Sequence, residues 1–399
     1  MTTSRNHFLQ YLGQTSQFPL MLEIEKAEGL YMYQKDGKEL MDLISGIGVS
    51  TIGHRHQRVV KAIKEQVDKH LHLMVYGEFV TSPQVKLAKA LSDTLPDTLD
   101  NVFLVNSGSE ATEGGIKLAK RYTGRTEIIS FQNAYHGSTA GALSVCGNED
   151  LKNNFRPLIP GNRILNFGNI EDLSQISEDT AAVIIEPVQG EGGIRTASKE
   201  YFQELRKVCD QQGTLLIFDE IQTGYGRTGK FWAFEHYDIV PDILLCAKGM
   251  GGGMPIGAFI SSKKIMHSLT HNPMLGHITT FGGHPVSCVA ALETLNIILE
   301  ENLMDGIVAK EALFHELLQH DKVNEIRSKG LMIAVEFESF EVLEKIIKNL
   351  LDLGVLSDWF LFCDNSMRIA PPLIISDEEI KKACNKILQA IDMSYCQSV

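Results

Sequence analysis

Short apolar segments bounded by polar or glycine residues recur through the middle of the chain. They are NVFLVN, EIISF, AAVIIEP, TLLIFDE and ILLCAKG, at residues 101–106, 127–131, 181–187, 214–220 and 243–249. Apolar runs of this length predict buried β-strands. Between them lie helical patterns, for example small or apolar residues at Ala111, Gly115, Leu118, Ala119 and Tyr122. Alternating strands and helices predict an α/β fold with a mostly parallel, doubly wound sheet covered on both faces.

The two ends of the chain show a different pattern. Residues 30–42 alternate in polarity around Lys35-Asp36-Gly37, which predicts a β-hairpin. A long helical stretch runs from Val286 to about Leu303, and short α and β patterns follow it. We therefore predict a large domain over residues 46–299 and a smaller α+β domain formed by residues 1–45 and 300–399.

Composition and charge exclude several classes of protein. The 399 residues are 44% hydrophobic and 22% charged, so a disordered or fibrous chain is excluded. Asp and Glu number 50 against 37 for Lys and Arg, a net charge of −13. A chain this acidic has no overall field for nucleic acid or an anionic membrane, and we expect neither as a partner.

Cysteine usage and hydropathy bear on the cellular compartment. The seven cysteines are an odd number without a CxxC pair, so we expect neither a disulfide framework nor a structural zinc site. The first twenty residues hold no uninterrupted apolar segment, and no run approaches the roughly 20 residues that span a bilayer. We expect a cytoplasmic protein. His54 and His56 have no third ligand at helical spacing, so we expect no metal.

Polar residues cluster where the predicted strands end, the edge at which α/β sheets bind ligands. They are Asn106-Ser107-Gly108, Glu186, Asp219-Glu220 and Lys248. At Ser107-Gly108-Ser109 a strand passes directly into a helix, so the free N–H groups form an anion site suited to a phosphate. The alternative is a plain helix N-cap.

Asp219 ends an apolar run, where a carboxylate needs a cation, a donor or a metal. The nearby Gly224-x-Gly226-x-x-Gly229 matches a dinucleotide fingerprint, but it stands several residues beyond the strand and we interpret it as a glycine-rich loop. Lys248 also ends an apolar run. Desolvation there makes a lysine nucleophilic toward carbonyls, whereas the alternative is a lysine extending from a strand end into solvent.

Together, a phosphate cradle, an aspartate and a lysine 29 residues later are what pyridoxal 5′-phosphate requires. The chain resembles the class III (omega-type) aminotransferases of fold type I, which include acetylornithine and ornithine aminotransferases. The motifs that carry the resemblance are, in order, NSGSEATEGGIKLA, AYHGST, EPVQGEGG, FDEIQTGYGRTG, AKGMGGGMPIGA, TTFGGHP and RIAPPL. The resemblance implies a PLP-dependent transferase fold with a large cofactor-binding domain, and a homodimer with a composite active site.

The resemblance also implies roles for single residues. Lys248 would form the internal aldimine and shuttle a proton, and Asp219 would hydrogen-bond the ring nitrogen. Ser107, Gly108 and Ser109 would bind the phosphate. The other cofactor-binding residues it implies are Tyr135 and Ile221 on the two ring faces, Gln222 near the phenolic oxygen, and Thr280 at the phosphate of the neighbouring subunit. Glu186 would orient Gln222 or serve a structural role, and we interpret His136 as a packing histidine.

For the substrates, the resemblance implies that Arg368 grips a carboxylate and that Glu191 pairs with Arg368 when an end without a carboxylate enters. The reaction would move an amino group from an omega-amino or ornithine-like donor to a 2-oxo acid in two half-reactions. The alternatives are an aminomutase or racemase on the same scaffold, a non-catalytic cofactor-binding protein, or, from the glycine-rich loop alone, a nicotinamide dehydrogenase.

Two positions depart from the family pattern. Ser138 stands where acetylornithine, ornithine and 4-aminobutyrate enzymes carry an arginine, and Ile47 stands where ornithine enzymes often carry an aromatic residue. The YHGST form is more like enzymes that act on omega-amines, diamines or β-amino acids and favour pyruvate. These departures leave the donor and the acceptor open.

Overall fold

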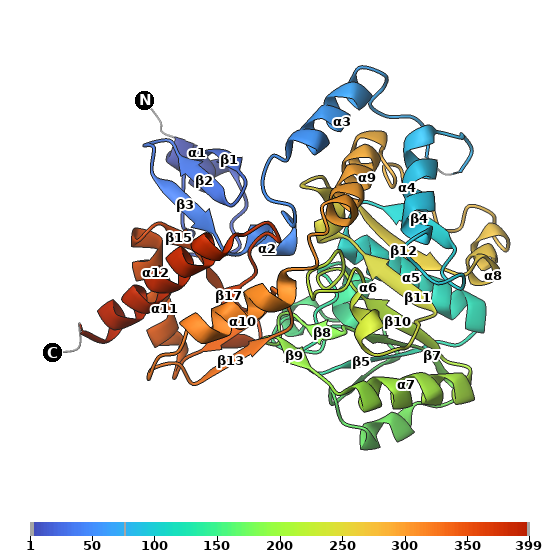
Figure 1. Cartoon of the computed structure of the whole chain (residues 1–399). Coiled ribbons are helices and arrows are strands. Elements are labelled where there is room, and N and C mark those ends of the chain that lie inside the picture. The colour runs from blue at the N-terminus through green and yellow to red at the C-terminus, as the bar shows by residue number, and fades with distance from the viewer. Residues whose placement is uncertain (1–3, 76, 397–399) are drawn as a thin grey trace.

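A large sheet with its helices lies beside two smaller sheets in the structure, a computed structural model that describes residues 4–75 and 77–396 (Figure 1). The helices are α1 (Ser4–Tyr11), α2 (Ser45–Gly48), α3 (Gln57–Val67), α4 (Ser82–Ser92), α5 (Gly108–Thr123), α6 (Ala140–Ser144), α7 (Lys199–Gln212), α8 (Lys263–Met266), α9 (Pro285–Glu300), α10 (Ile307–Leu317), α11 (Phe340–Asp352) and α12 (Asp377–Cys396). Within the described ranges, none is long and apolar enough to cross a membrane.

The large sheet has seven strands, and only β12 runs antiparallel to its neighbours. In spatial order they are β4 (Asn101–Val105), β12 (Gly257–Ser261), β11 (Ile243–Cys246), β10 (Leu215–Asp219), β7 (Thr180–Ile185), β5 (Glu127–Phe131) and β6 (Asn162–Leu165). The five strands expected from apolar runs are β4, β5, β7, β10 and β11. The prediction of a mostly parallel α/β sheet is therefore confirmed, while β6 and β12 were not foreseen.

Each central strand is buried on both faces because helices cover both sides of the sheet. Val183, Leu216 and Leu244 join a core that includes residues of α4, α7 and α9. Their immediate neighbours along the strands, Ile184, Ile217 and Leu245, join a separate core on the side of α5. This double burial explains why these strands appear in the sequence as continuous apolar runs.

The two smaller sheets combine both ends of the chain. One consists of β1 (Ile24–Glu28), β2 (Tyr31–Gln34), β3 (Glu39–Asp42) and β15 (Val355–Leu356). The other consists of β13 (Glu325–Ser328), β14 (Ile333–Glu336), β17 (Cys363–Ile369) and β16 (Asp358–Phe360). The antiparallel pairing of β2 with β3 confirms the expected hairpin.

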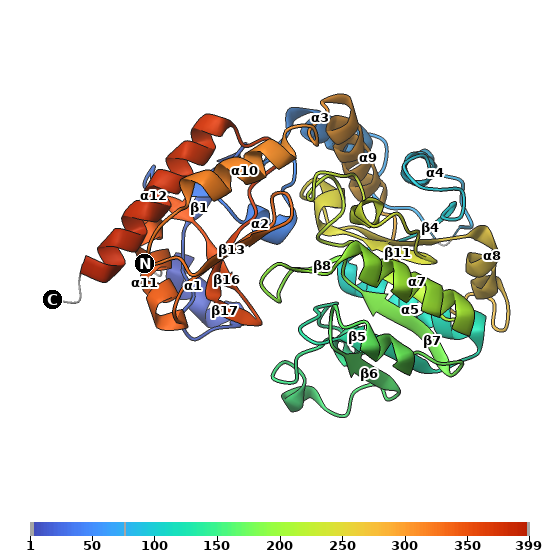
Figure 2. The ribbon, with the colours of Figure 1, turned by 60° about the horizontal axis from the view of Figure 1, so that its bottom comes forward.

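The parallel pairing of β3 with β15 joins residues more than 300 positions apart, for example Met41 and Val355. Leu30 and Met41 share one apolar core with residues of α11 and α12. Association of the two ends agrees with a small domain built from both, and its boundaries at residues 45 and 300 stay a prediction. A short hairpin of β8 (Val188–Gln189) and β9 (Arg195–Thr196) extends from the large sheet toward the two smaller sheets (Figure 2).

Candidate active site

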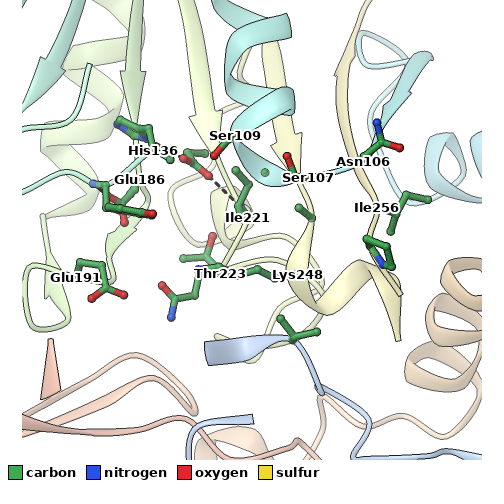
Figure 3. A pocket seen from close by; sticks show the side chains of 18 of the residues that line it. Asn106, Ser107, Ser109, His136, Glu186, Glu191, Ile221, Thr223, Lys248 and Ile256 are labelled. Atoms are coloured by element: carbon green, nitrogen blue, oxygen red, sulfur yellow. Dashed lines mark hydrogen bonds and ion pairs between the residues drawn. The ribbon is translucent and has the colours of Figure 1, made fainter. Parts of the chain in front are cut away.

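A cavity of about 470 Å³ lies at the carboxyl ends of the large sheet's parallel strands. Among its lining residues are nine of the predicted site residues: Ser107, Gly108, Ser109, Tyr135, Glu191, Asp219, Ile221, Gln222 and Lys248. Ser107 and Ser109 lie at the start of α5, the two glutamates Glu186 and Glu191 lie to their left in this view, and Lys248 lies below the serines (Figure 3). Residues that are up to 141 positions apart in the sequence thus line one cavity.

The start of α5 has the geometry of an anion cradle. Ser107 is the N-cap, and its hydroxyl accepts a hydrogen bond from Glu110 N at 3.2 Å, so the capping interpretation holds as well. A Cβ on Gly108 would lie 3.0 Å from Ile221 Cδ1, and one on Gly137 would lie 2.2 Å from Ser109 Oγ. The glycines therefore leave the first N–H groups of a sixteen-residue helix open to the cavity.

Asp219 is held by a buried histidine. Its Oδ2 lies 2.7 Å from His136 Nδ1, and its Oδ1 accepts a hydrogen bond from Ile221 N at 3.1 Å. His136 is itself anchored, because its carbonyl accepts a hydrogen bond from the Thr112 hydroxyl at 2.9 Å. The interpretation of His136 as a packing residue missed this contact. The sequence signal was its place beside Tyr135 in AYHG, but nothing local points to a partner 83 residues away.

Lys248 lies two residues beyond the last residue of β11, at the start of a short 3-10 turn (Lys248–Gly251), and its φ is 43°. Within the described part of the chain its amine has no hydrogen-bond or salt-bridge partner, although its side chain faces the cavity. Burial lowers the pKa of the Lys248 amine, against the opposing effect of nearby carboxylates, chiefly that of Glu191. A lysine in this state carries a neutral amine more readily than one in solvent.

Arg368 and Glu191 form a buried, bidentate ion pair. Arg368 Nη1 and Nη2 donate to Glu191 Oε1 and Oε2, each at 2.9 Å. Leu361 N also donates to Glu191 Oε2 at 3.0 Å. Burial by itself would raise the pKa of Glu191, but Arg368 lowers it below its usual value. Glu191 lies between Arg368 and the cavity, since Glu191 is part of the lining and Arg368 is not.

The Glu186 carboxylate accepts its hydrogen bonds from backbone N–H groups and not from Gln222. Its two carboxylate oxygens accept hydrogen bonds from Tyr135 N at 2.8 Å and from Gly190 N at 2.9 Å. No hydrogen bond joins Glu186 to Gln222 among the described residues, so the contacts support the structural role of Glu186. Burial raises the pKa of Glu186 to about 7.

Glu220 does not line the cavity. The sequence had suggested that it would, because it belongs to the group of polar residues at the ends of the predicted strands. Its carboxylate accepts hydrogen bonds from Ala233 N and Phe234 N, each at 2.7 Å. The reason is the alternation of side chains along a strand, which sends neighbouring residues to opposite faces. The following glycine-rich segment, 224–229, is a run of turns without a helix, as expected.

The comparisons with known proteins agree with this geometry. The family model for aminotransferase class III matches residues 12–391. This chain belongs to the class III aminotransferase family. It is 39% identical over 389 residues to an acetylornithine aminotransferase of Methanopyrus kandleri, covering 96% of this chain and 97% of that protein. It is 38% identical to a [LysW]-aminoadipate semialdehyde/glutamate semialdehyde transaminase of Sulfolobus acidocaldarius, covering 93% and 95%.

Solved structures of aminotransferases share the fold. An ornithine aminotransferase from Toxoplasma gondii matches with a TM-score of 0.91 and 30% identity, covering 98% of this chain and 93% of that one. The expected fold type I is thus confirmed, and the chain is an aminotransferase of a family that depends on pyridoxal 5′-phosphate. These relatives offer no support for an aminomutase or a racemase.

Three positions of this class III aminotransferase lie at the edge of the site or beyond it. Thr280 is exposed and does not line the cavity, although its neighbour Thr279 accepts a hydrogen bond from Asn106 Nδ2 at 3.0 Å. Ser138 Oγ lies 3.0 Å from the Tyr135 hydroxyl. Ile47 is 39% exposed and has a φ of 62°. Their roles toward cofactor, acceptor and donor stay predictions.

The first histidine of the GHRH motif, His54, makes a structural contact. His54 Nε2 lies 2.8 Å from Asp42 Oδ2, and the same carboxylate group accepts hydrogen bonds from Ile44 N and Ser45 N. The described residues contain no group of three His, Cys, Asp or Glu side chains able to hold a metal ion.

Proposed function

We propose that this class III aminotransferase binds pyridoxal 5′-phosphate in the cavity and moves an amino group from an omega-amino or ornithine-like donor to a 2-oxo acid in two half-reactions. The observation that carries the proposal is the pairing of β10 with β11. This pairing brings Asp219 and Lys248 to one end of the sheet, where both line a cavity that also holds the start of α5.

The residues present fit the cofactor. Backbone N–H groups and hydroxyls at Ser107, Gly108 and Ser109 suit a phosphate, which the positive end of α5 also favours. Asp219 would hold a proton on the ring nitrogen. The other contacts would come from Tyr135 and Ile221 on the ring faces and Gln222 at the phenolic oxygen. When bound, the cofactor supplies a carbonyl that takes up the amino group and a ring that withdraws electrons.

Two residues would act on protons. Lys248 Nζ, with no competing hydrogen bond and a lowered pKa, is suited to taking a proton from the substrate carbon and returning it. His136 Nδ1, 2.7 Å from Asp219 Oδ2, fixes the orientation of the Asp219 carboxylate that would hold the proton on the ring nitrogen. The role of His136 is therefore one of positioning.

Arg368 is the group proposed to grip a substrate carboxylate, because a planar guanidinium binds carboxylates with two parallel hydrogen bonds. Glu191 would cover it when the entering end of the donor carries no carboxylate. The names of the relatives favour acetylornithine, ornithine or related semialdehyde-forming donors. Ser138 in place of an arginine favours a short acceptor such as pyruvate.

We further propose that a second copy of this chain completes the site. Large apolar side chains on either side of Thr280 are exposed, among them Met274 at 79%, Ile278 at 48% and Phe281 at 54%. A homodimer that covers this surface would bring Thr280 to the partner's phosphate site. The seven unpaired cysteines fit a reducing cytoplasm.

The test is the visible absorption of the cofactor-loaded protein during separate additions of ornithine, acetylornithine, lysine, 4-aminobutyrate, β-alanine and a diamine. At least one amine should convert the absorption to that of the amine form, and pyruvate or 2-oxoglutarate should then restore it. Lys248→Ala should abolish this exchange. Lys120→Ala, at the far end of α5, is the matched control and should behave as wild type. Exchange that persists in Lys248→Ala would contradict the proposal.

A further inference from the structure

Arg368 faces a second carboxylate besides Glu191. Asp358 on β16 lies directly across from Arg368 on β17 in the antiparallel pair, and its Oδ1 is 3.0 Å from Arg368 Nε. These two atoms lack hydrogen-bond geometry, and neither has another hydrogen-bond partner among residues 4–75 and 77–396. The contact is therefore one of opposite charges across two strands.

The guanidinium is occupied on every side. Its two Nη atoms donate to Glu191, Nη2 also donates to the Trp359 carbonyl at 3.0 Å, and its carbon lies 4.7 Å from the centre of the Phe360 ring. Asp358 covers the remaining edge at Nε. A substrate carboxylate can therefore pair with both Nη atoms of Arg368 only after Glu191 leaves them.

The charges of this cluster do not balance. Arg368 brings one positive charge, and Glu191 and Asp358 bring two negative ones. Burial raises the pKa of Asp358 to about 6, so its carboxylate is ionised at pH 8. An entering carboxylate would be a third negative charge around one guanidinium, whereas an uncharged or cationic end would add none.

We propose that Asp358 is a specificity-determining residue, which weakens the capture of carboxylates at Arg368 and so favours donors whose reacting end carries no carboxylate. The inference rests on the proposed function, because it assumes that Arg368 receives substrate carboxylates. It assigns to this chain the class of omega-amines and diamines, with a high KM for the 2-oxo acid.

Asp358→Asn removes the charge and keeps the shape. The probe is glutarate, a dicarboxylate with neither an amine nor a carbonyl, titrated into the cofactor-loaded enzyme at pH 8 by calorimetry. Removing a like charge from a partly screened site should tighten glutarate binding on the order of tenfold, about 1.4 kcal/mol. The KM for pyruvate should fall by a similar factor while kcat and the KM for the amine stay within about twofold.

Asp364→Asn is the matched control, because Asp364 is an exposed carboxylate on β17, the strand that carries Arg368, and its removal changes the net charge equally. It should leave glutarate binding unchanged. Repeating the pair of variants in a Glu191→Gln background removes the competing carboxylate, and Asp358→Asn should still tighten binding there. Asp358→Ser provides a second neutral variant if the asparagine variant folds poorly.

Unchanged or weaker glutarate binding in both neutral variants would overturn the inference, since Asp358 would then merely position Arg368. Failure of the proposed function has a different signature. In that case no amine alters the absorption of the wild-type cofactor, whatever the glutarate titrations give.

Discussion

The two ends of the cavity are built in different ways. At the proposed cofactor end, the phosphate would bind at a contiguous turn, residues 107–109, where a strand passes into α5. The proposed substrate end consists of Glu191 from the β8–β9 hairpin, Arg368 from β17 and Asp358 from β16, which come together only in the folded chain. Backbone dipoles serve the first end, whereas buried side-chain charges serve the second. Anion binding at the first end would therefore depend on neighbouring residues, whereas at the second end it would depend on the charges of residues that are distant in the sequence.

The largest expected effect on stability comes from removing Arg368, the cation at the proposed substrate end. Arg368→Ala leaves Glu191 and Asp358 as carboxylates without their cation, and Glu191 is deeply buried. Loss of one partner of a buried pair costs about 3–5 kcal/mol in the free energy of unfolding. Denaturant unfolding in a fixed cofactor state measures this loss.

The control for this variant is Arg58→Ala. Arg58 also contacts two glutamates, Glu293 at 3.1 Å and Glu300 at 2.7 Å, but on the surface. Its removal should cost no more than about 1 kcal/mol. Adding Glu191→Gln to Arg368→Ala should recover part of the loss. Equal losses for the two arginine variants would contradict the view that buried charges hold the substrate end together.

The next effect concerns Glu186, which links the two ends through Tyr135 N and Gly190 N. Its folded-state pKa of about 7 exceeds the usual value of 4.5 because of burial. The folded state therefore binds more protons than the unfolded state between these values, and stability falls as pH rises from about 4.5 to about 7. The contribution is up to about 3 kcal/mol.

Glu186→Gln should flatten this part of the stability profile, measured by denaturant unfolding at several pH values. Glu113→Gln is the comparison, because Glu113 also accepts hydrogen bonds from backbone N–H groups, those of Gly141 and Ala142, but is less buried. It should leave the slope as in wild type. If Glu186→Gln left the slope unchanged, protonation of Glu186 would not be the cause of the pH dependence of stability.

The smallest expected effect concerns His136, which contacts Asp219 at the proposed cofactor end. His136→Phe keeps an aromatic ring but removes the 2.7 Å contact to Asp219, and it leaves the cavity's carboxylates and Lys248 in place. Partners that orient a functional group are typically worth tenfold to about a hundredfold, so kcat should fall by roughly that factor while the KM values change little. The absorption of the bound cofactor should also shift its pH dependence, which a purely structural role would not cause. Normal kcat and an unshifted absorption profile would argue against a positioning role.

Much of the fold followed from local patterns. Five strands of the large sheet, the start of α5 and the β2–β3 hairpin were predictable because burial on both faces, helix capping and turn chemistry act over a few residues. β12 escaped prediction because its short apolar run directly follows a glycine-rich segment. Glu220 was misplaced because neighbouring strand residues point to opposite faces, and the sequence does not say which faces the ligand.

The sequence by itself determined the class of fold, the strand ends that carry Asp219 and Lys248, and the motif order that resembles class III aminotransferases. Only the tertiary structure decided the partners of these groups: His136 beside Asp219, Glu186 on two backbone amides, and Asp358 as a second carboxylate on Arg368. The physical reason is the distance along the sequence over which each interaction acts. Periodicity, capping and burial leave traces in neighbouring residues, whereas ion pairs and buried hydrogen bonds join segments whose distance in sequence carries no information about their distance in space.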